Sequence, residues 1–133
     1  MPILEWSEIL PRVELATPAE FDHAIDTLSA RSSVNHPTIV ALYAHGHQVI
    51  LGLGLPESFV QVQDWGEQPG NKAALVTVGN AAADGEVSFY LLGSQHTEIP
   101  RRNLIPITTA RQLARAFLFE SGKVSAEVAW EPV

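Results

Sequence analysis

The stretch TIVALYAHGHQVILGLG, residues 38–54, carries the clearest β-sheet pattern in the chain. Two runs rich in β-branched and large apolar residues, Thr38 to Ala44 and Gln48 to Gly54, flank the turn His45-Gly46-His47. Such runs favour strands, and a short glycine-containing turn between them is typical of a hairpin. The sequence therefore predicts an antiparallel hairpin near the middle of the chain.

Further strand-like runs follow at spacings near ten residues. Residues 59–65 alternate in the way that a half-buried strand does. Ala73 to Gly79 and Glu86 to Gly93 flank a loop that ends in Asp84-Gly85, which predicts a second hairpin. Residues 124–130 alternate again and predict a closing strand.

Two helices interrupt this pattern. Thr17-Pro18-Ala19-Glu20 is a capping box with proline at the first helical position, and it predicts a helix at about 18–30. The second helix is predicted at about 109–121, between a capping-box spacing at Thr109 and a glycine stop at Gly122. Phe119 lies almost opposite the apolar stripe of this helix, so we expect the helix to be covered on two sides, by its own chain or by a partner.

The expected class is α+β: one domain over residues 1–133, with two helices and an antiparallel sheet of about five to seven strands. The chain has 133 residues, of which 46% are hydrophobic and 17% are charged, so it can bury one core. It has no cysteine, which excludes a disulfide framework and a cysteine nucleophile.

The formal charge is −7, which argues against nucleic acid or an anionic membrane as a direct partner. Residues 1–98 carry twelve acidic and three basic side chains, whereas residues 99–133 carry three acidic and five basic ones. Such asymmetry favours a basic partner or serves solubility alone.

The first residues do not form a secretory signal and no window is apolar enough for a membrane span, so we expect a cytoplasmic protein.

The sequence offers weak candidates for chemistry. His45 and His47 could share a strand face, and His96 could complete a metal site or a hydrolase centre, but a tight turn breaks the alternation that would align them. Asp64 with Glu67 could act as an acid–base pair, yet acid pairs are expected in a chain with fifteen acids. There is no Gly-x-Ser-x-Gly motif. We therefore expect no catalytic residue, metal or cofactor.

A binding surface is the stronger candidate. Four side chains share one face of the strand at 59–65: Phe59, Gln61, Gln63 and Trp65. Flat aromatics among amides and acids are typical of interfaces that hold a partner tightly. The alternative is that the first helix covers this face and that Phe59 and Trp65 belong to the core. The predicted contact surface adds Asp64 and Glu67, with three acids as steering charges: Glu57, Asp84 and Glu86.

The last part of the chain contains a recognisable pattern. Its elements, in chain order, are Glu98-Ile99-Pro100, Leu104-Ile105-Pro106-Ile107, Thr109-Ala110 with Ala114, Ala116 and Phe117, then Ser121-Gly122 and Val128-Ala129-Trp130-Glu131. Together with the two strand-like runs from Ala73 to Gly93, they resemble the end of the first Imm family of bacterial immunity proteins. The resemblance covers roughly residues 73–133 and is not visible before them.

This resemblance implies a cytoplasmic protein, without enzymatic activity of its own, that binds and neutralises a cognate toxin in a polymorphic toxin system. Toxins of that kind often act on nucleic acids, as nucleases or deaminases. The alternative function is a small-ligand or regulatory binding module, which would form a homodimer through Phe119. The toxin's identity, its activity and whether its active site or an exosite is blocked are not given by the sequence.

Overall fold

The computed structural model describes residues 2–5, 12–64, 74–91 and 95–133. The helices are α1 (Pro18–Arg31) and α2 (Ile107–Ala116), with a 3₁₀ turn η1 (Arg101–Asn103) and a π-helical turn η2 (Phe117–Ser121). The strands are β1 (Ile3–Glu5), β2 (Val13–Glu14), β3 (Thr38–Ala44), β4 (His47–Leu53), β5 (Glu57–Ser58), β6 (Val60–Asp64), β7 (Ala74–Val78), β8 (Glu86–Leu91), β9 (Gln95–Pro100), β10 (Ile105–Pro106) and β11 (Ala129–Pro132).

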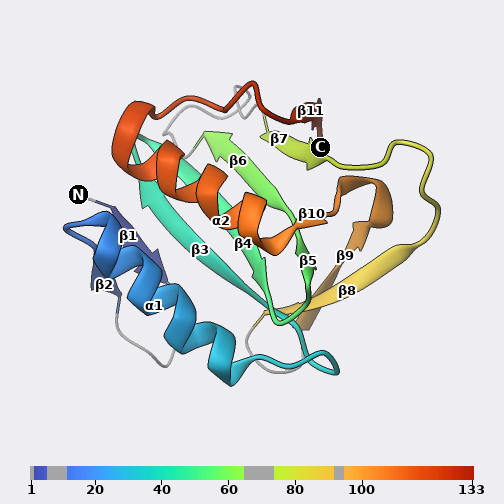
Figure 1. The fold of residues 1–133 in the computed structure, drawn as a ribbon, viewed down its shortest axis with the longest axis horizontal. Helices are drawn as coiled ribbons and strands as arrows, with labels where there is room; N and C mark the ends of the chain where they lie inside the picture. Colours follow the sequence, from blue (N-terminus) through green and yellow to red (C-terminus); the bar gives the residue numbers. More distant parts are fainter. Residues whose placement is uncertain (1, 6–11, 65–73, 92–94) are drawn as a thin grey trace.

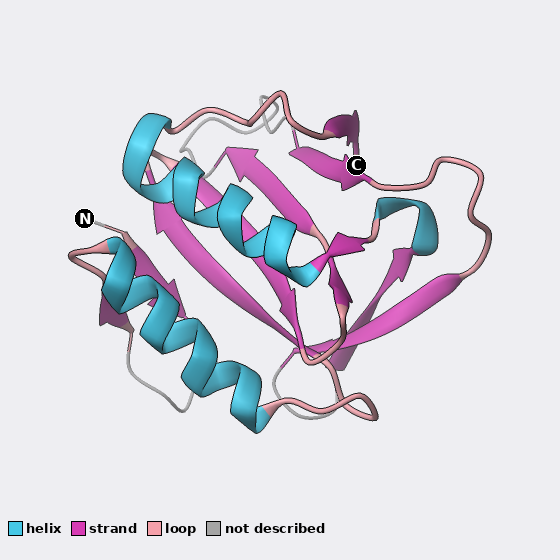
Figure 2. Ribbon diagram, viewed as in Figure 1, coloured by secondary structure: helices cyan, strands magenta, loops and turns pink. Residues whose placement is uncertain are grey.

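One large sheet organises the molecule, and both helices lie on the same side of it (Figures 1 and 2). Its strand order is β11-β7-β6-β4-β3-β1-β2, and β8 joins β3 while β9 joins β8. Strand pairs are antiparallel except β3 with β8, which run parallel where Thr38 meets Tyr90. The α+β class is confirmed. Within the described residues the main sheet has nine strands, more than the five to seven predicted.

The predicted central hairpin forms, with a turn one residue shorter than the predicted His45-Gly46-His47 because His47 begins β4. Ala44 pairs with His47, so His45 and Gly46 form a two-residue turn with φ of 55° and 74°. Hairpin turns of this length favour left-handed residues because they match the twist of the strands. The alternation of β3 and β4 then sends Val40 and Leu42 to the helix side of the sheet and Ile39 to the other.

The second predicted hairpin is wrong. β7 pairs with β6 and β11, whereas β8 pairs with β9. After β7 the backbone N–H groups of Gly79 and Asn80 donate to the carbonyl of Arg102, at 2.8 and 3.2 Å. These bonds fasten the end of β7 to η1 and not to the start of β8. Local alternation indicates where strands lie, but long-range contacts decide which strands pair.

The first helix follows its capping box. The Glu20 N–H donates to the Thr17 hydroxyl over 3.2 Å, and the Glu20 carboxylate accepts from the Ala16 N–H. The second helix begins two residues before the predicted Thr109, because the Ile107 N–H is satisfied by the Pro56 carbonyl at 2.9 Å and needs no side-chain cap.

The end of the second helix follows its glycine stop, since η2 ends at Gly122 in the left-handed conformation, with φ of 63°. The closing strand is shorter than predicted and begins at Ala129. Trp130 lies in it half-buried, and its indole N–H donates to the Ser125 carbonyl over 2.7 Å.

Two apolar clusters lie on opposite sides of the sheet. The larger one joins α1 and α2 to the sheet, and the smaller one comprises Ile39, Phe59, Val76, Phe89, Ile99 and Leu104. On η2, which continues α2, Phe119 meets Phe21 of α1 edge to face, with ring centroids 6.3 Å apart. Arg111 and Arg115 pair with acids of α1 on the same side. The side of this helix opposite its apolar stripe is therefore covered by α1 of the same chain, and not by a partner.

Candidate partner-binding surface

A row of polar side chains crosses the side of the sheet that points away from both helices. Gln61 and Gln63 lie here because the alternating Val60 and Val62 belong to the helix-side cluster. The Gln63 amide donates to the carboxamide oxygen of Gln48 on β4. The Gln48 amide donates in turn to the Tyr43 hydroxyl on β3, at 3.0 Å. We call Tyr43, Gln48, Gln61 and Gln63 the polar sheet face.

The row continues to the edge of the sheet. The Arg12 guanidinium lies 5.6 Å from the centre of the Tyr43 ring and forms an ion pair of 2.6 Å with Glu5. The sequence reasoning included Gln61 and Gln63 but missed Tyr43 and Gln48. The sequence contains a signal for them, since Tyr43 and Gln48 face each other across the central hairpin and each is adjacent in sequence to a hydrophobic residue that points to the helices, Leu42 and Val49.

A hollow of about 260 Å³ opens where this face meets β9 and β11. It is lined by Gln61, Val76, Thr97, Glu98, Ile99, Pro100, Asn103, Glu131, Pro132 and Val133. Gln61 belongs to both features, so the hollow is continuous with the polar sheet face. Its lining combines apolar walls with acidic and amide side chains.

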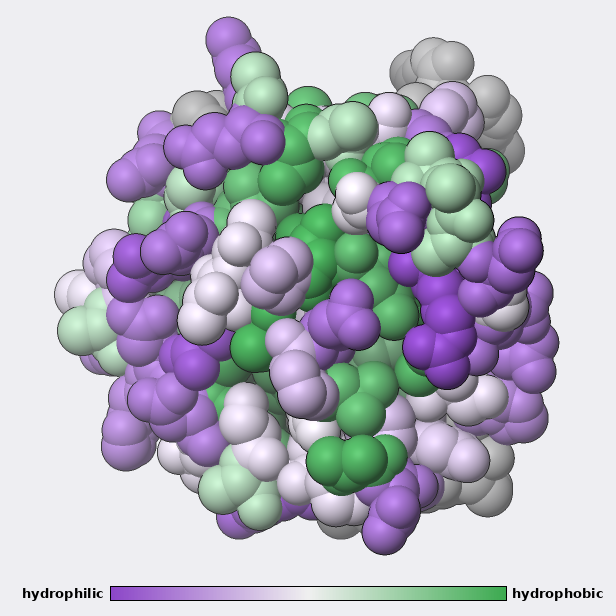
Figure 3. All heavy atoms as spheres, turned by 45° about the vertical axis from the view of Figure 1, so that its right-hand side comes forward, coloured by the Kyte–Doolittle hydropathy of each residue, from purple (hydrophilic) through white to green (hydrophobic). Residues whose placement is uncertain are grey.

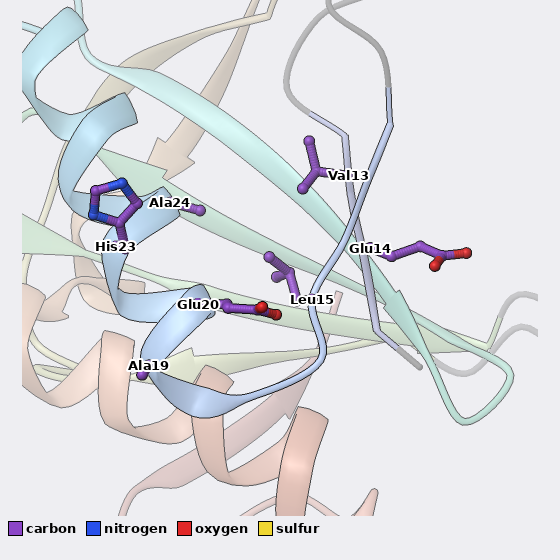
Figure 4. A pocket seen from close by; sticks show the side chains of 7 residues that line it. All are labelled: Val13, Glu14, Leu15, Ala19, Glu20, His23 and Ala24. Carbon is purple, nitrogen blue, oxygen red and sulfur yellow. The ribbon is translucent and has the colours of Figure 1, made fainter.

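A second hollow, of about 460 Å³, lies at the opposite edge of the sheet, between β2 and the start of α1. Figure 4 shows Val13 and Leu15 on one side of it and Ala19, His23 and Ala24 of the helix on the other. Its exposed surface is mainly apolar, and Val13 is 45% exposed. None of the residues predicted for partner contact lies here.

The structure places Phe59 in the core, which corrects its assignment to the contact surface. Its side chain is fully buried and meets the Phe89 ring edge to face, with centroids 5.2 Å apart. The smaller cluster beneath β8 and β9 holds it, not the first helix as in the alternative interpretation. Phe59 precedes β6, and a period-two pattern cannot tell a face that other strands cover from one that solvent covers.

Three other predicted contacts cannot be placed. Asp64 ends β6, opposite His47, but its side chain lies outside the described residues, as do Trp65 and Glu67.

The predicted steering charges are exposed and fall in two places, Glu57 in one and Asp84 with Glu86 in the other. Glu57 lies in β5, which pairs with the residues just before α2. Asp84 precedes β8 by two residues, and Glu86 is the first residue of β8. A hydrogen bond to Glu98 and the negative charge of Glu98 raise the pKa of Glu86 above its ordinary 4.5. The outer side of the β8–β9 ribbon therefore carries two adjacent carboxyl groups.

The three histidines weighed as ligands have other roles. The ring nitrogen Nε2 of His45 bonds the Leu118 carbonyl at 3.0 Å, and Nδ1 of His47 bonds the His45 carbonyl at 2.8 Å. His96 lies on β9 beside Tyr90, with ring centroids 5.8 Å apart. In the part of the chain that the structure describes, no three His, Asp or Glu side chains gather to hold a metal ion.

Figure 3 shows the molecule turned so that the right-hand side of Figure 1 comes forward. This face carries a band of hydrophobic residues between hydrophilic ones. Neither described helix has the length and apolar composition that a membrane crossing requires. A broad sheet side with amides, a tyrosine and acids is typical of a surface that binds other proteins. The polar sheet face is therefore the candidate contact surface among the described residues.

The comparison with protein families agrees and is more specific. The family model described as immunity protein Imm1 matches residues 11–132, nearly the whole chain. The chain therefore belongs to the Imm1 family of immunity proteins, and the partner of an immunity protein is a toxin. The match confirms the resemblance seen in residues 73–133 and extends it through α1 and the central hairpin. A search of curated proteins gives no match.

Proposed function

We propose that this protein neutralises a cognate toxin of a polymorphic toxin system by direct binding in the cytoplasm, without chemistry of its own. The polar sheet face is the contact surface in this proposal, and its continuous row of hydrogen-bonded side chains is the observation that carries it. The row spans three strands, from Gln63 through Gln48 to Tyr43.

The row suits tight binding because its members are held before a partner arrives. An interface side chain that is already ordered loses less conformational entropy on binding. Amides can donate and accept at once, and tyrosine adds a large flat contact with a polar end. The rigid strands beneath fix the spacing of these groups, so the surface can select one partner over others.

The charge supports a toxin that acts on nucleic acid, as a nuclease or deaminase. Such an enzyme keeps a positive cleft for phosphates. The chain has a formal charge of −7, and Glu57, Asp84, Glu86 and Glu98 are exposed. No basic side chain among the described residues forms an ion pair with these four. Complementary potentials of this kind speed association and exclude the anionic substrate.

The small-ligand alternative has less support. Pockets that hold drug-sized ligands measure about 300–1,000 Å³ and place a few polar groups around an apolar interior. The hollow beside Gln61 is smaller, at about 260 Å³. The hollow between β2 and α1, at about 460 Å³, is large enough but mainly apolar and lies on the rim of the sheet.

The test is binding to the toxin domain encoded beside this protein, inactivated so that it can be purified. Gln48→Arg places a bulky cation in the centre of the polar sheet face and should weaken binding at least about tenfold, with loss of growth rescue. Gln112→Arg is the matched control, because Gln112 is exposed on α2. Equal, undiminished affinity of both folded variants would refute the assigned surface, and absence of any complex with the wild type would refute the function.

A further inference from the structure

The hollow at the end of the polar sheet face is ringed by hydrogen-bond acceptors. Its lining residues include two with carboxylates, Glu98 and Glu131, and two with carboxamides, Gln61 and Asn103. Among the described residues that line it there is no lysine, arginine or histidine. The carboxylates give this lining a negative charge, which favours a cationic ligand that brings hydrogen-bond donors.

Asn103 is a lining residue whose carboxamide is held in one orientation by the chain itself. It is only 3% exposed, and its Nδ2 group donates to the Thr77 carbonyl at 3.0 Å and to the Glu131 carboxylate at 2.8 Å. These bonds fix the carboxamide, so its Oδ1 atom is the one left to accept. No described residue donates to that oxygen. This oxygen is not among the described buried side-chain atoms that lack a partner, so it keeps some access to solvent and a donor from a partner can reach it.

The two carboxylates differ in their state. Glu131 is already paired, since its second oxygen accepts from Arg102 at 2.6 Å. Glu98 is exposed, and its neighbour is the like-charged Glu86, whose pKa it raises. Most of the uncompensated negative charge at the hollow therefore belongs to Glu98. A cation beside Glu98 would add an attractive charge to a site where the neighbouring charge of Glu86 is repulsive.

We propose that this hollow receives one arginine side chain of the toxin, a contact that rests on the proposed function. The planar guanidinium has five N–H donors in a fixed arrangement, enough for the Glu98 carboxylate and the oxygens of Asn103 and Gln61 together. Val76 and Ile99 form apolar walls against which the methylene stem would pack. The volume of about 260 Å³ lies below that of drug-sized pockets and suits a single side chain.

The test measures the affinity of Glu98 variants for the inactivated toxin domain. Glu98→Gln removes the charge and keeps the shape, and it should weaken binding at least about tenfold. Glu98→Arg places a guanidinium of the chain's own at the hollow and should weaken binding further. Glu127→Gln and Glu127→Arg are matched controls at an exposed acid outside the lining, and they should leave the dissociation constant within about twofold.

The melting temperature separates misfolding from lost contact. Because Glu98→Gln also removes repulsion on Glu86, the free variant should melt no lower than wild type at neutral pH. Alanine replacement of each toxin arginine, combined with Glu98→Gln in a double-mutant cycle, should identify one arginine whose effect disappears in the Glu98 variant. Coupling to a lysine alone would overturn the assignment of arginine.

The outcomes distinguish this inference from the proposed function. If Gln48→Arg abolishes binding while both Glu98 variants bind like wild type, the polar sheet face is the contact surface and the arginine site is refuted. If the Glu98 and Gln48 variants all bind like wild type, both the site and the surface are refuted.

Discussion

Replacing Phe59 by alanine separates the two roles that this residue was assigned. In the structure its ring is fully buried against Phe89, 5.2 Å away between centroids. Truncating a core phenylalanine costs about 3–5 kcal/mol, from lost transfer free energy and the cavity left behind. Truncating a contact residue that is exposed to solvent would lower the free energy of unfolding by about 0.5 kcal/mol or less.

The expected change is large enough to measure directly. A domain of 133 residues has an unfolding entropy of about 0.28 kcal/mol/K near its melting temperature, so a loss of about 4 kcal/mol lowers Tm by about 14 °C. In urea, with a slope of about 2 kcal/mol/M, the midpoint should fall by about 2 M. Circular dichroism monitors both transitions.

Two further variants complete the experiment. Phe59→Leu leaves a smaller cavity and should cost about 1.5 kcal/mol, and Gln61→Ala on the polar sheet face should change stability by about 0.5 kcal/mol or less. At temperatures where Phe59→Ala is still folded it should bind the toxin nearly as well as wild type. A Phe59→Ala variant with unchanged Tm and lost toxin binding would refute the core assignment and return this residue to the interface.

Three other perturbations test particular features of the fold. Glu98 raises the pKa of Glu86 in the folded protein. The protonated Glu86 carboxyl therefore stabilises the fold at a pH below the pKa that Glu86 has in the unfolded chain. This stabilisation is lost as the pH rises through the higher pKa of the folded protein. Glu86→Gln should therefore raise Tm at neutral pH and match wild type near pH 3, and thermal melts from about pH 3 to 8 check this. Gly79→Ala should cost about 3 kcal/mol by urea unfolding, because its Cβ would lie 1.8 Å from the Leu104 carbonyl oxygen; an unchanged midpoint would contradict that close approach. Gly46→Ala meets no atom within 4 Å and should cost only about 1 kcal/mol, the price of a left-handed alanine.

The family resemblance rested on the last 60 or so residues, which contain clear local signals for where elements end and begin. A glycine at Gly122 and a tryptophan at Trp130 mark the helix end and the closing strand with local chemistry. The family match includes residues 11–72 as well, although no motif there stands out. The described residues in this range form α1 and the central strands. Their alternating hydrophobic side chains fill a core that many other sequences could also fill.

The sequence by itself determined the elements whose signals are local. The capping box at Thr17, the hairpin turn at His45-Gly46 and the glycine stop at Gly122 each specify backbone geometry within a few residues, and all three appear in the structure. Period-two alternation likewise separated Val60 and Val62 from Gln61 and Gln63, because successive strand residues must point to opposite sides.

Only the tertiary structure decided which strands pair and which sides are covered. Alternation is the same whether β7 pairs with β8 or with β11, and the choice came from hydrogen bonds to η1, more than twenty residues away. The burial of Phe59 under β8 and β9, and the meeting of Gln61, Glu98 and Asn103 at one hollow, depend on the same long-range packing. Such contacts are properties of the folded chain as a whole, since each gains its free energy only when distant segments have already come together.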